Sequence, residues 1–466
     1  GIDFVVDGHS HTVMTKGEKG EPIQSTGTAF KNIGVIVIDD ASKKIESNSL
    51  YEIKEDTAKD ATVAAAAKVI VDRVNNEYGT KFATSKVELN GAKAPNGNRD
   101  VETNNGDLIT DAMRWKVLQN KDGLTVNEDH VVAITNGGGI RAAIAKGDVT
   151  KKDINTVLPF GNTVAVVYVT GEQLLEALEA STFSTPTAVG GFPQVSGINF
   201  TIHTGKAYDK NDATYPESTY YGPKTINRVV INSVNGKEFK ANEVYAVVTN
   251  NFCAAGGDTY YAFKAASAQF DTGIPLDEAV MEYVTKELKG VIGEQYDAPQ
   301  GRILLNPFKD VKVSSWFGKY VIDLYNDGII NGTSATTYAP NDTLTWAAAL
   351  KLLLVSHGDL KAADATGADW SKNTIAKAAE LGLVAADLDG AKAISRLEFC
   401  QVAAKLNKLA ESKTESKFTD CTDGYVMALV DAKVINGMTE TTFEPSATLT
   451  RAQIAKIIYQ LNLIEK

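Results

Sequence analysis

The spacing of apolar residues divides the chain into regions of different character. Ile2–Val6 and Asn32–Asp39 are short apolar, β-branched runs bounded by aspartate and glycine, so we expect a strand at each, the first of them buried. Residues 57–78 are rich in alanine, lack proline and stop at Gly79, which predicts a helix of several turns. Because this helix stands alone between strand-containing segments, we expect it to connect two domains.

The middle of the chain, residues 81–306, alternates strand-like and helix-like runs. One stretch is expected to form a helix with Leu108, Ala112 and Trp115 on one face. A later strand leads directly into a helix whose first turn has Thr170 and Gln173 in the spacing of a capping box. This alternation predicts a single α/β (α+β) domain.

The last part of the chain, residues 307–466, repeats itself. The segment that begins at Ile329 matches the segment that begins at Val434, an offset of 105 residues. A weaker middle copy has Ser395 where the outer copies have threonine. The pattern predicts three all-α units that bury their core by packing together, each a helix, a loop and a helix, at about residues 308–357, 366–407 and 418–463.

Composition narrows the class of protein. Hydrophobic residues make up 43% and charged residues 23%, which are ordinary values for a folded globular protein. The net charge is −11, with acidic residues spread along the chain, so neither nucleic acid nor an anionic membrane surface is expected as the main partner. The three cysteines are widely separated and predict no disulfide framework. No apolar run is long enough to predict membrane insertion.

Two histidines one residue apart follow the first expected strand. In an extended segment, residues two apart point the same way, so His9 and His11 could offer neutral imidazole nitrogens to one metal cluster. The alternative is a polar loop in which one histidine caps the strand. The remaining histidines stand singly in the sequence, at His130, His203 and His357.

Gly8–Thr12 resembles the last metal motif of the calcineurin-like metallophosphoesterases, in particular of the 5'-nucleotidase family. The resemblance implies that His9 and His11 each bind one of two divalent ions, zinc, manganese or similar, in a longer parent protein. The family's Gly-Asn-His motif is missing here, and no early Asp-x-His motif stands ahead of the pair. We therefore expect residues 1–55 to be the C-terminal remnant of a metallophosphoesterase domain with an incomplete metal site and no catalytic residue, and 56–80 to be the linker helix.

Four ordered stretches between about Ser85 and Leu305 resemble the C-terminal, substrate-binding domain of the same family. They read GNRDVETNNGDLITDAM, TNGGGIR, VLPFGNTV and VVTNNFCAAGGDTY. The resemblance covers the whole middle domain, 81–306, and implies that it binds a nucleotide substrate. A 5'-mononucleotide, a nucleotide diphosphate sugar and a 2',3'-cyclic nucleotide would all suit such a site.

Six residues of these stretches have the chemistry that nucleotide binding needs. By resemblance, Phe160 and Phe252 form an aromatic clamp, and a base stacked on aromatic rings gains about 1–3 kcal/mol. Asn136 opens a glycine loop and has both a donor and an acceptor for a base edge. Arg99 and Arg141 supply planar donors for phosphate, and Asp258 is an acceptor for ribose hydroxyls. The alternatives are core aromatics and a surface set of ion pairs.

The C-terminal units resemble S-layer homology (SLH) modules, which hold bacterial proteins on an anionic secondary cell-wall polysaccharide. The signature Thr-Arg-Ala-Glu stands here as Thr450–Gln453, Ser395–Glu398 and, degraded, Thr345–Ala348. A capping box alone would explain the first and last residues but not the arginine, which opposes the helix dipole. A helix N-terminus with an arginine is suited to an anion, so we expect Arg396 and Arg451 to bind the polymer. Trp346 replaces the arginine of the first unit and has no charge, so we expect the first pocket to be altered or lost, although the indole could stack on a sugar.

Together these features predict an extracellular 5'-nucleotidase-type hydrolase, anchored to a bacterial cell wall or S-layer, of which this chain has the nucleotide-binding and wall-binding parts. Two other classes stay open: a non-catalytic, wall-bound nucleotide-binding protein, and a structural S-layer protein.

Overall fold

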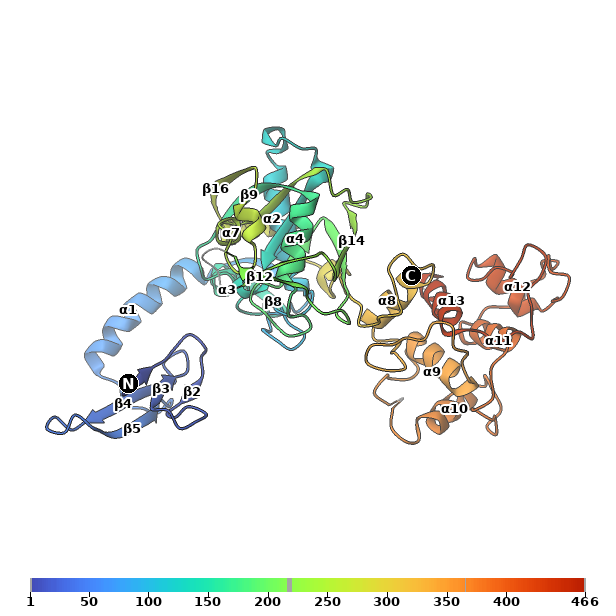
Figure 1. Cartoon of the computed structure of the whole chain (residues 1–466), viewed down its shortest axis with the longest axis horizontal. Helices are drawn as coiled ribbons and strands as arrows, with labels where there is room; N and C mark the ends of the chain where they lie inside the picture. The colour runs from blue at the N-terminus through green and yellow to red at the C-terminus, as the bar shows by residue number, and fades with distance from the viewer. Residues whose placement is uncertain (1, 216–219, 365, 465–466) are drawn as a thin grey trace. The chain divides into compact units, whose positions relative to one another are not determined.

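The computed structural model describes residues 2–215, 220–364 and 366–464 (Figure 1). They divide into two compact units, one ending at Gly79 and one beginning at Thr80. Among the described residues, no helix combines the length and the apolar character needed to cross a membrane.

The first unit consists of two small sheets and one helix. Strands β1 (Val5–Val6), β3 (Ile23–Thr26) and β2 (Val13–Met14) form one sheet in that order, and β4 (Asn32–Ile38) pairs with β5 (Ile45–Glu52). Helix α1 (Ala61–Tyr78) follows, with Asp60 accepting hydrogen bonds from the backbone N–H groups of Thr62 and Val63 at its start. The predicted strand over Asn32–Asp39 and the predicted helix are confirmed.

The prediction of a buried strand over Ile2–Val6 is wrong. Only Val5 and Val6 are in a strand, and both are exposed, because β1 pairs on one edge with β3 and its faces are not covered within the described residues. Helix α1 likewise buries none of its residues, and Val69 and Ile70 face solvent.

A five-stranded sheet forms the centre of the middle domain. Its strand order is β10 (Pro193–Ser196), β7 (Val131–Asn136), β15 (Val244–Asn250), β9 (Thr163–Thr170) and β16 (Ala268–Pro275), and only β7 and β15 are parallel. Helices α2 (Asn104–Leu118) and α7 (Leu276–Lys286) share one hydrophobic core with the sheet, and α4 (Gly171–Ser181) shares another. The alternation of side chains along β7 explains the two cores: Val131 and Ala133 point into the first, and Val132 and Ile134 into the second.

Smaller elements complete this domain. Two three-stranded sheets have the orders β14 (Val229–Val234), β11 (Ile198–Ile202), β18 (Ile303–Leu305) and β17 (Val291–Ile292), β6 (Lys81–Ser85), β8 (Gly147–Thr150). Strand β12 (Lys210–Thr214) pairs antiparallel with β13 (Tyr221–Pro223), and the remaining α-helices are α3 (Lys151–Val157), α5 (Asn251–Ala254) and α6 (Tyr261–Lys264). The predicted helix face at Leu108 and Ala112 is buried, and the Thr170–Gln173 capping box forms as predicted.

Helices alone follow β18 among the regular elements of the described residues. They are α8 (Gly318–Asn326), α9 (Trp346–His357), α10 (Trp370–Glu380), α11 (Arg396–Leu406), α12 (Gly424–Asp431) and α13 (Arg451–Ile464). The six pack around one continuous core, as two helices from each predicted unit (Figure 1).

The three units close on one another in a cycle. The first backbone N–H of α9 donates to Lys392 of the second unit, that of α11 donates to Ala447 of the third, and that of α13 donates to Asp342 of the first, at 2.9, 2.8 and 2.8 Å. The same pair of hydrogen bonds supports each outer unit, because Asp310 accepts from the backbone N–H groups of Tyr338 and Ala339 and Asp420 accepts from those of Phe443 and Glu444. The repeats seen in the sequence therefore correspond to repeated hydrogen bonds.

Candidate functional site

The predicted nucleotide-binding residues gather at one edge of the five-stranded sheet. The parallel strands β7 and β15 end there, and antiparallel β9 begins there, with Asn250 opposite Val164. Asn136 ends β7, Phe160 precedes β9, and Phe252 lies in α5 directly after β15. Segments that are far apart in the sequence thus bring their loops to the same place.

Asn136 and Asp258 are joined directly. The Nδ2 group of Asn136 donates to Oδ2 of Asp258 at 2.8 Å, and the Oδ1 atom of Asn136 accepts from Nδ2 of Asn250 at 3.0 Å. Asn136 is buried and has one N–H and one lone pair left for a ligand, which is less than its sequence context suggested. Burial raises the pKa of Asp258, while the hydrogen bond from Asn136 and the charge of Arg99 oppose this rise.

The two arginines carry positive charge to the same edge. Arg141 donates from Nη1 to the carbonyl of Gly138 at 3.2 Å, and its guanidinium lies 5.5 Å from the centre of the Phe160 ring. Burial and the nearby charge of Arg141 lower the pKa of Arg99, with Asp258 acting in the opposite direction. Two guanidinium groups that repel each other beside one carboxylate are suited to receive an additional anion.

The two phenylalanines are open to solvent. Phe160 is 59% exposed and Phe252 is 45% exposed, although an isolated large aromatic side chain favours burial. The ring of Phe252 lies so close to Gly257 that a Cβ atom there would come within 2.6 Å of it, which explains why glycine precedes Asp258. Both rings therefore present apolar surface beside the arginines and Asp258.

Two side chains that support this edge were given no role in the sequence analysis. Asn250 joins β15 to β7, and the buried Gln194 accepts from the backbone N–H of Thr103 and donates to the carbonyls of Asn98 and Val101. The side chain of Gln194 thereby holds the loop that carries Arg99. Their position inside or beside the glycine-rich motifs was the available signal.

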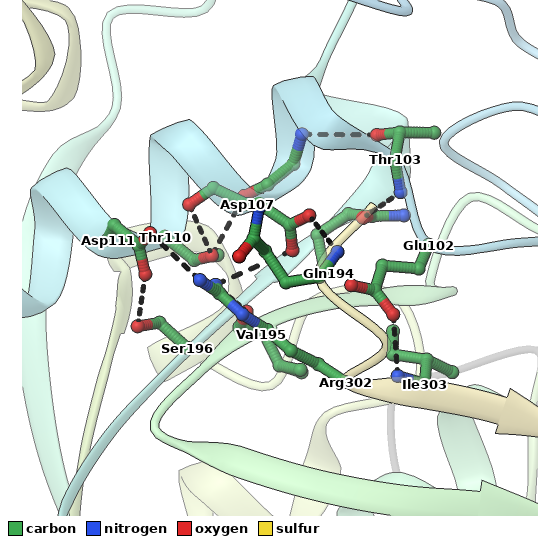
Figure 2. Close-up of polar contacts among 12 residues, drawn as sticks. Glu102, Thr103, Asp107, Thr110, Asp111, Gln194, Val195, Ser196, Arg302 and Ile303 are labelled. Carbon is green, nitrogen blue, oxygen red and sulfur yellow. Dashed lines mark hydrogen bonds and ion pairs between the residues drawn. The ribbon is translucent and has the colours of Figure 1, made fainter. Parts of the chain in front are cut away.

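A buried polar cluster anchors the other side of that loop. Figure 2 shows Asp107 and Asp111 on α2 facing Arg302, which immediately precedes β18. Arg302 donates to Oδ2 of Asp111 at 2.8 Å and lies 3.5 Å from Oδ1 of Asp107, while Glu102 accepts from the backbone N–H of Ile303 at 2.7 Å.

Three carboxyl groups thus surround one guanidinium. Burial, followed by the charge of Glu102, raises the pKa of Asp107 to about 9, and burial also raises the pKa of Glu102. Oε1 of Glu102 and Oδ1 of Asp107 are buried, and no other group of the described residues forms a hydrogen bond with either oxygen. A hydrogen bond from Asp107 lowers the pKa of Glu102. The raised pKa favours the protonated form of Asp107 at neutral pH, in which its carboxyl group can donate to Glu102.

The expected geometry of the histidine pair is wrong. His9 and His11 have φ angles of 64° and 59°, in the left-handed region, so the segment is not extended and the simple alternation of side chains does not apply. Both side chains are exposed. Within the described residues, no three or more histidine, cysteine, aspartate or glutamate side chains are grouped in a way that could hold a metal ion. The residues present therefore do not fit a binuclear metal centre.

The two arginines of the C-terminal repeats lie in matching surroundings. Arg396 donates to the carbonyl of Asn436 at 2.6 Å, and its guanidinium lies 4.6 Å from the Phe443 ring centre. Arg451 donates to the carbonyl of Asn331 at 2.8 Å and lies 4.5 Å from the Tyr338 ring centre. Each arginine thus bridges to the next unit in the cycle, and no carboxylate forms an ion pair with either one in the described part of the chain.

Arg396 borders a pocket of about 160 Å³ that also contacts Trp316, Asn436, Gly437 and Lys456. The suggestion that Trp346 stacks on a sugar is wrong, because its side chain is 7% exposed and packs in the core of the repeats. An indole without a charge is stabilised by this burial, whereas the arginines keep their charged ends at polar backbone groups.

A mixed sheet covered on both faces, with aromatic and cationic side chains at the edge where its parallel strands end, defines a ligand-binding α/β domain. Residues 81–265 match the family described as "5'-nucleotidase, C-terminal domain", and residues 307–349 and 420–455 match the S-layer homology domain. The chain therefore has the C-terminal domain of the 5'-nucleotidase family, joined to S-layer homology domains. The middle repeat, 366–407, lies outside both SLH matches and stays a prediction.

The chain is also similar to individual proteins. The chain is 32% identical over 324 residues to the trifunctional nucleotide phosphoesterase protein YfkN of Bacillus subtilis, across 65% of this chain and 20% of that protein. It is 28% identical over 269 residues to a 5'-nucleotidase of Vibrio cholerae, across 56% of this chain and 41% of that protein. A solved structure of a 5'-nucleotidase precursor from Thermus thermophilus is 28% identical, with a TM-score of 0.47, across 65% of this chain and 59% of the other. The matches thus span only part of each of these relatives.

Proposed function

We propose that the middle domain binds a nucleoside 5'-phosphate at the sheet edge described above. Phe160 and Phe252 stack on the base, Asp258 accepts from the ribose hydroxyls, and Arg99 and Arg141 receive the phosphate. The observation that carries this proposal is the meeting of exposed aromatic rings with two guanidinium groups and a carboxylate at one edge. Stacking and charge-assisted hydrogen bonds are the two interactions that a nucleotide offers.

We further propose that the SLH domains hold the protein on an anionic polysaccharide of a bacterial cell wall, outside the cell. Arg396 and Arg451 bind acidic groups of this polymer. Each arginine contacts a carbonyl oxygen and an aromatic ring, and neither forms an ion pair with a carboxylate of the described residues, although the charge of Glu444 acts on Arg396. Their charge is therefore available to an external anion.

Phosphate release is proposed for the longer parent protein. The relatives' names refer to phosphoesterases and 5'-nucleotidases, and the family generally depends on divalent metal ions, zinc, manganese or similar. His9 and His11 are the residues of this chain that would contribute to such a centre. They are too few to form it, so the nucleotide is held here without the groups that hydrolyse it.

Calorimetric titration of the full chain with AMP and with adenosine tests the binding proposal. We expect AMP to bind at least tenfold more tightly than adenosine, because hydrogen bonds to charged groups contribute about 1.5–3 kcal/mol each. Arg141→Ala should reduce this preference, and Arg73→Ala, at an exposed position of α1, should not. Equal affinity for the two ligands would contradict the role of the arginines.

A second assay tests hydrolysis. Phosphate release from a panel of nucleotides, with manganese or zinc, should occur with the longer parent and not with this chain. Release by this chain would contradict the account of the metal ligands. AMP binding without release by the parent would favour a non-catalytic nucleotide-binding protein.

A further inference from the structure

Asn250 is a buried residue that connects β15 to β7, the two parallel strands whose ends lie at the proposed nucleotide site. It is the last residue of β15 and is 1% exposed. Its Oδ1 atom accepts from the backbone N–H of Cys253 at 2.9 Å, which caps helix α5. Its Nδ2 group donates to Oγ1 of Thr135 at 2.9 Å and to Oδ1 of Asn136 at 3.0 Å.

These bonds determine which way each amide points. A backbone N–H can only donate, so the atom of Asn250 that faces Cys253 must be the oxygen. The NH₂ group of Asn250 then faces Asn136, which must present its own oxygen in return. The NH₂ group of Asn136 is thereby turned to Oδ2 of Asp258, at 2.8 Å. One backbone amide thus fixes the donor direction through two side chains.

Asp258 depends on this donor. It has a φ angle of 52°, in the left-handed region, and follows two glycines, so its own backbone gives it little support. The carboxylate is held between the N–H of Asn136 and the positive field of Arg99. With Oδ2 occupied, Oδ1 keeps its full accepting capacity for a ligand.

We propose that Asn250 is a positioning residue of the nucleotide site, which sets the orientation of the Asn136 amide and so holds Asp258 as the acceptor for the ribose hydroxyls. This inference rests on the proposed binding of nucleotides by the middle domain. It assigns the preference for a ribose to a residue that does not itself touch the ligand.

Asn250→Asp is the sharpest test, because the new carboxylate has nearly the same shape and still accepts from the N–H of Cys253. It cannot donate to Asn136, whose amide must then turn and direct its oxygen at Asp258. We expect the ratio of the Kd for 2',3'-dideoxy-AMP to the Kd for AMP, measured on the full chain, to be roughly tenfold or more in the wild type. The ratio should fall to about one in N250D. An added negative charge weakens both ligands alike, so the ratio isolates the hydroxyl contact.

Thr135→Val is the matched control, since it removes the other acceptor of the same NH₂ group and leaves the orientation of Asn136 unchanged. The ratio should persist in T135V and be lost in Asp258→Ala. Asn250→Ser keeps a hydroxyl to cap α5, does not reach Asn136 and provides a second variant, with an expected ratio below that of the wild type, if N250D does not fold.

The outcomes separate this inference from the proposed function. A wild-type chain that binds neither ligand overturns both. A wild-type chain that binds AMP with a ribose preference that N250D and N250S retain overturns the role of Asn250 alone. Binding of AMP without any ribose preference overturns the role of Asp258 and, with it, the inference.

Discussion

The arginine beside α2 and the arginines of the SLH repeats are all largely buried, yet their surroundings differ in one respect. Arg302 is enclosed by Asp107, Asp111 and, at greater distance, Glu102. Arg396 and Arg451 meet carbonyl oxygens and an aromatic ring instead.

A buried charge that is neutralised by nearby opposite charges acts within the folded domain and has little attraction left for an external ligand. A buried charge without a carboxylate partner is desolvated at a cost that only an external anion repays. The difference therefore separates an arginine that holds the middle domain together from the two for which we propose polymer binding. Burial and residue type alone would not separate them.

Removing the compensated arginine should have the largest effect. Arg302→Met leaves Asp111 partly buried beside Glu102 and Asp107 without a positive charge. We expect the middle domain to lose about 3–5 kcal/mol of stability, which is the usual cost of breaking a buried ion pair from one side. Hydrogen exchange of peptides from α2 measures this loss separately from the repeats. Unchanged protection of the α2 amides from hydrogen exchange would show that the cluster contributes nothing to the stability of the middle domain.

The acid pair beside Arg302 should make stability depend on pH. Because the pKa of Asp107 is raised from 3.8 to about 9 on folding, the folded state keeps a proton that the unfolded state has released. Stability should therefore fall as pH rises, by about 1–3 kcal/mol between pH 6 and pH 8.

Asp107→Asn mimics the protonated acid and should remove this pH dependence of α2 protection while keeping the domain folded. If the stability of D107N falls as steeply with rising pH as that of the wild type, the group that titrates is not Asp107.

Removing the uncompensated arginines should affect binding more than folding. We expect Arg396→Gln and Arg451→Gln each to lower the affinity for isolated cell walls, measured by co-sedimentation, by about tenfold, because a charge-assisted contact is lost. Each substitution should change the free energy of unfolding by about 1 kcal/mol or less. Arg73→Gln, at an exposed site of α1, is the matched control. If the double variant R396Q/R451Q still binds cell walls as the wild type does, the two arginines do not bind the polymer and the contrast with Arg302 has no functional meaning.

Most helices and strands could be predicted from the sequence, because the spacing of apolar residues along the chain reflects which side chains are buried. The helix after β9 was predictable from Thr170 and Gln173, and the three repeats from the offset of 105 residues. The cluster of Asp107, Arg302 and Glu102 was not, because Arg302 is far along the chain from the two acidic residues and no local pattern connects it to them. The strand at Ile2–Val6 failed for the opposite reason: its apolar run predicts burial, but burial depends on what covers it.

The candidate site was predictable as a set of residues and not as a geometry. The motifs placed Phe160 and Asp258 in loops, as the structure has them, since glycine-rich stretches after strands mark such loops, whereas Asn136 is the last residue of β7. The amide of Asn136 proved to be bonded at both ends, which depends on Asn250 from another strand. A pairing across strands cannot be read from either segment alone.

The affinity of the full chain for AMP, with and without its two exposed phenylalanines, tests the central claim most directly. Calorimetric titration should show one AMP bound per wild-type chain. Phe160→Ala with Phe252→Ala should weaken that binding by at least tenfold, since stacking on aromatic rings contributes about 1–3 kcal/mol, while both residues are too exposed for their loss to unfold the domain. Unchanged AMP affinity in a folded double variant would contradict the proposed site.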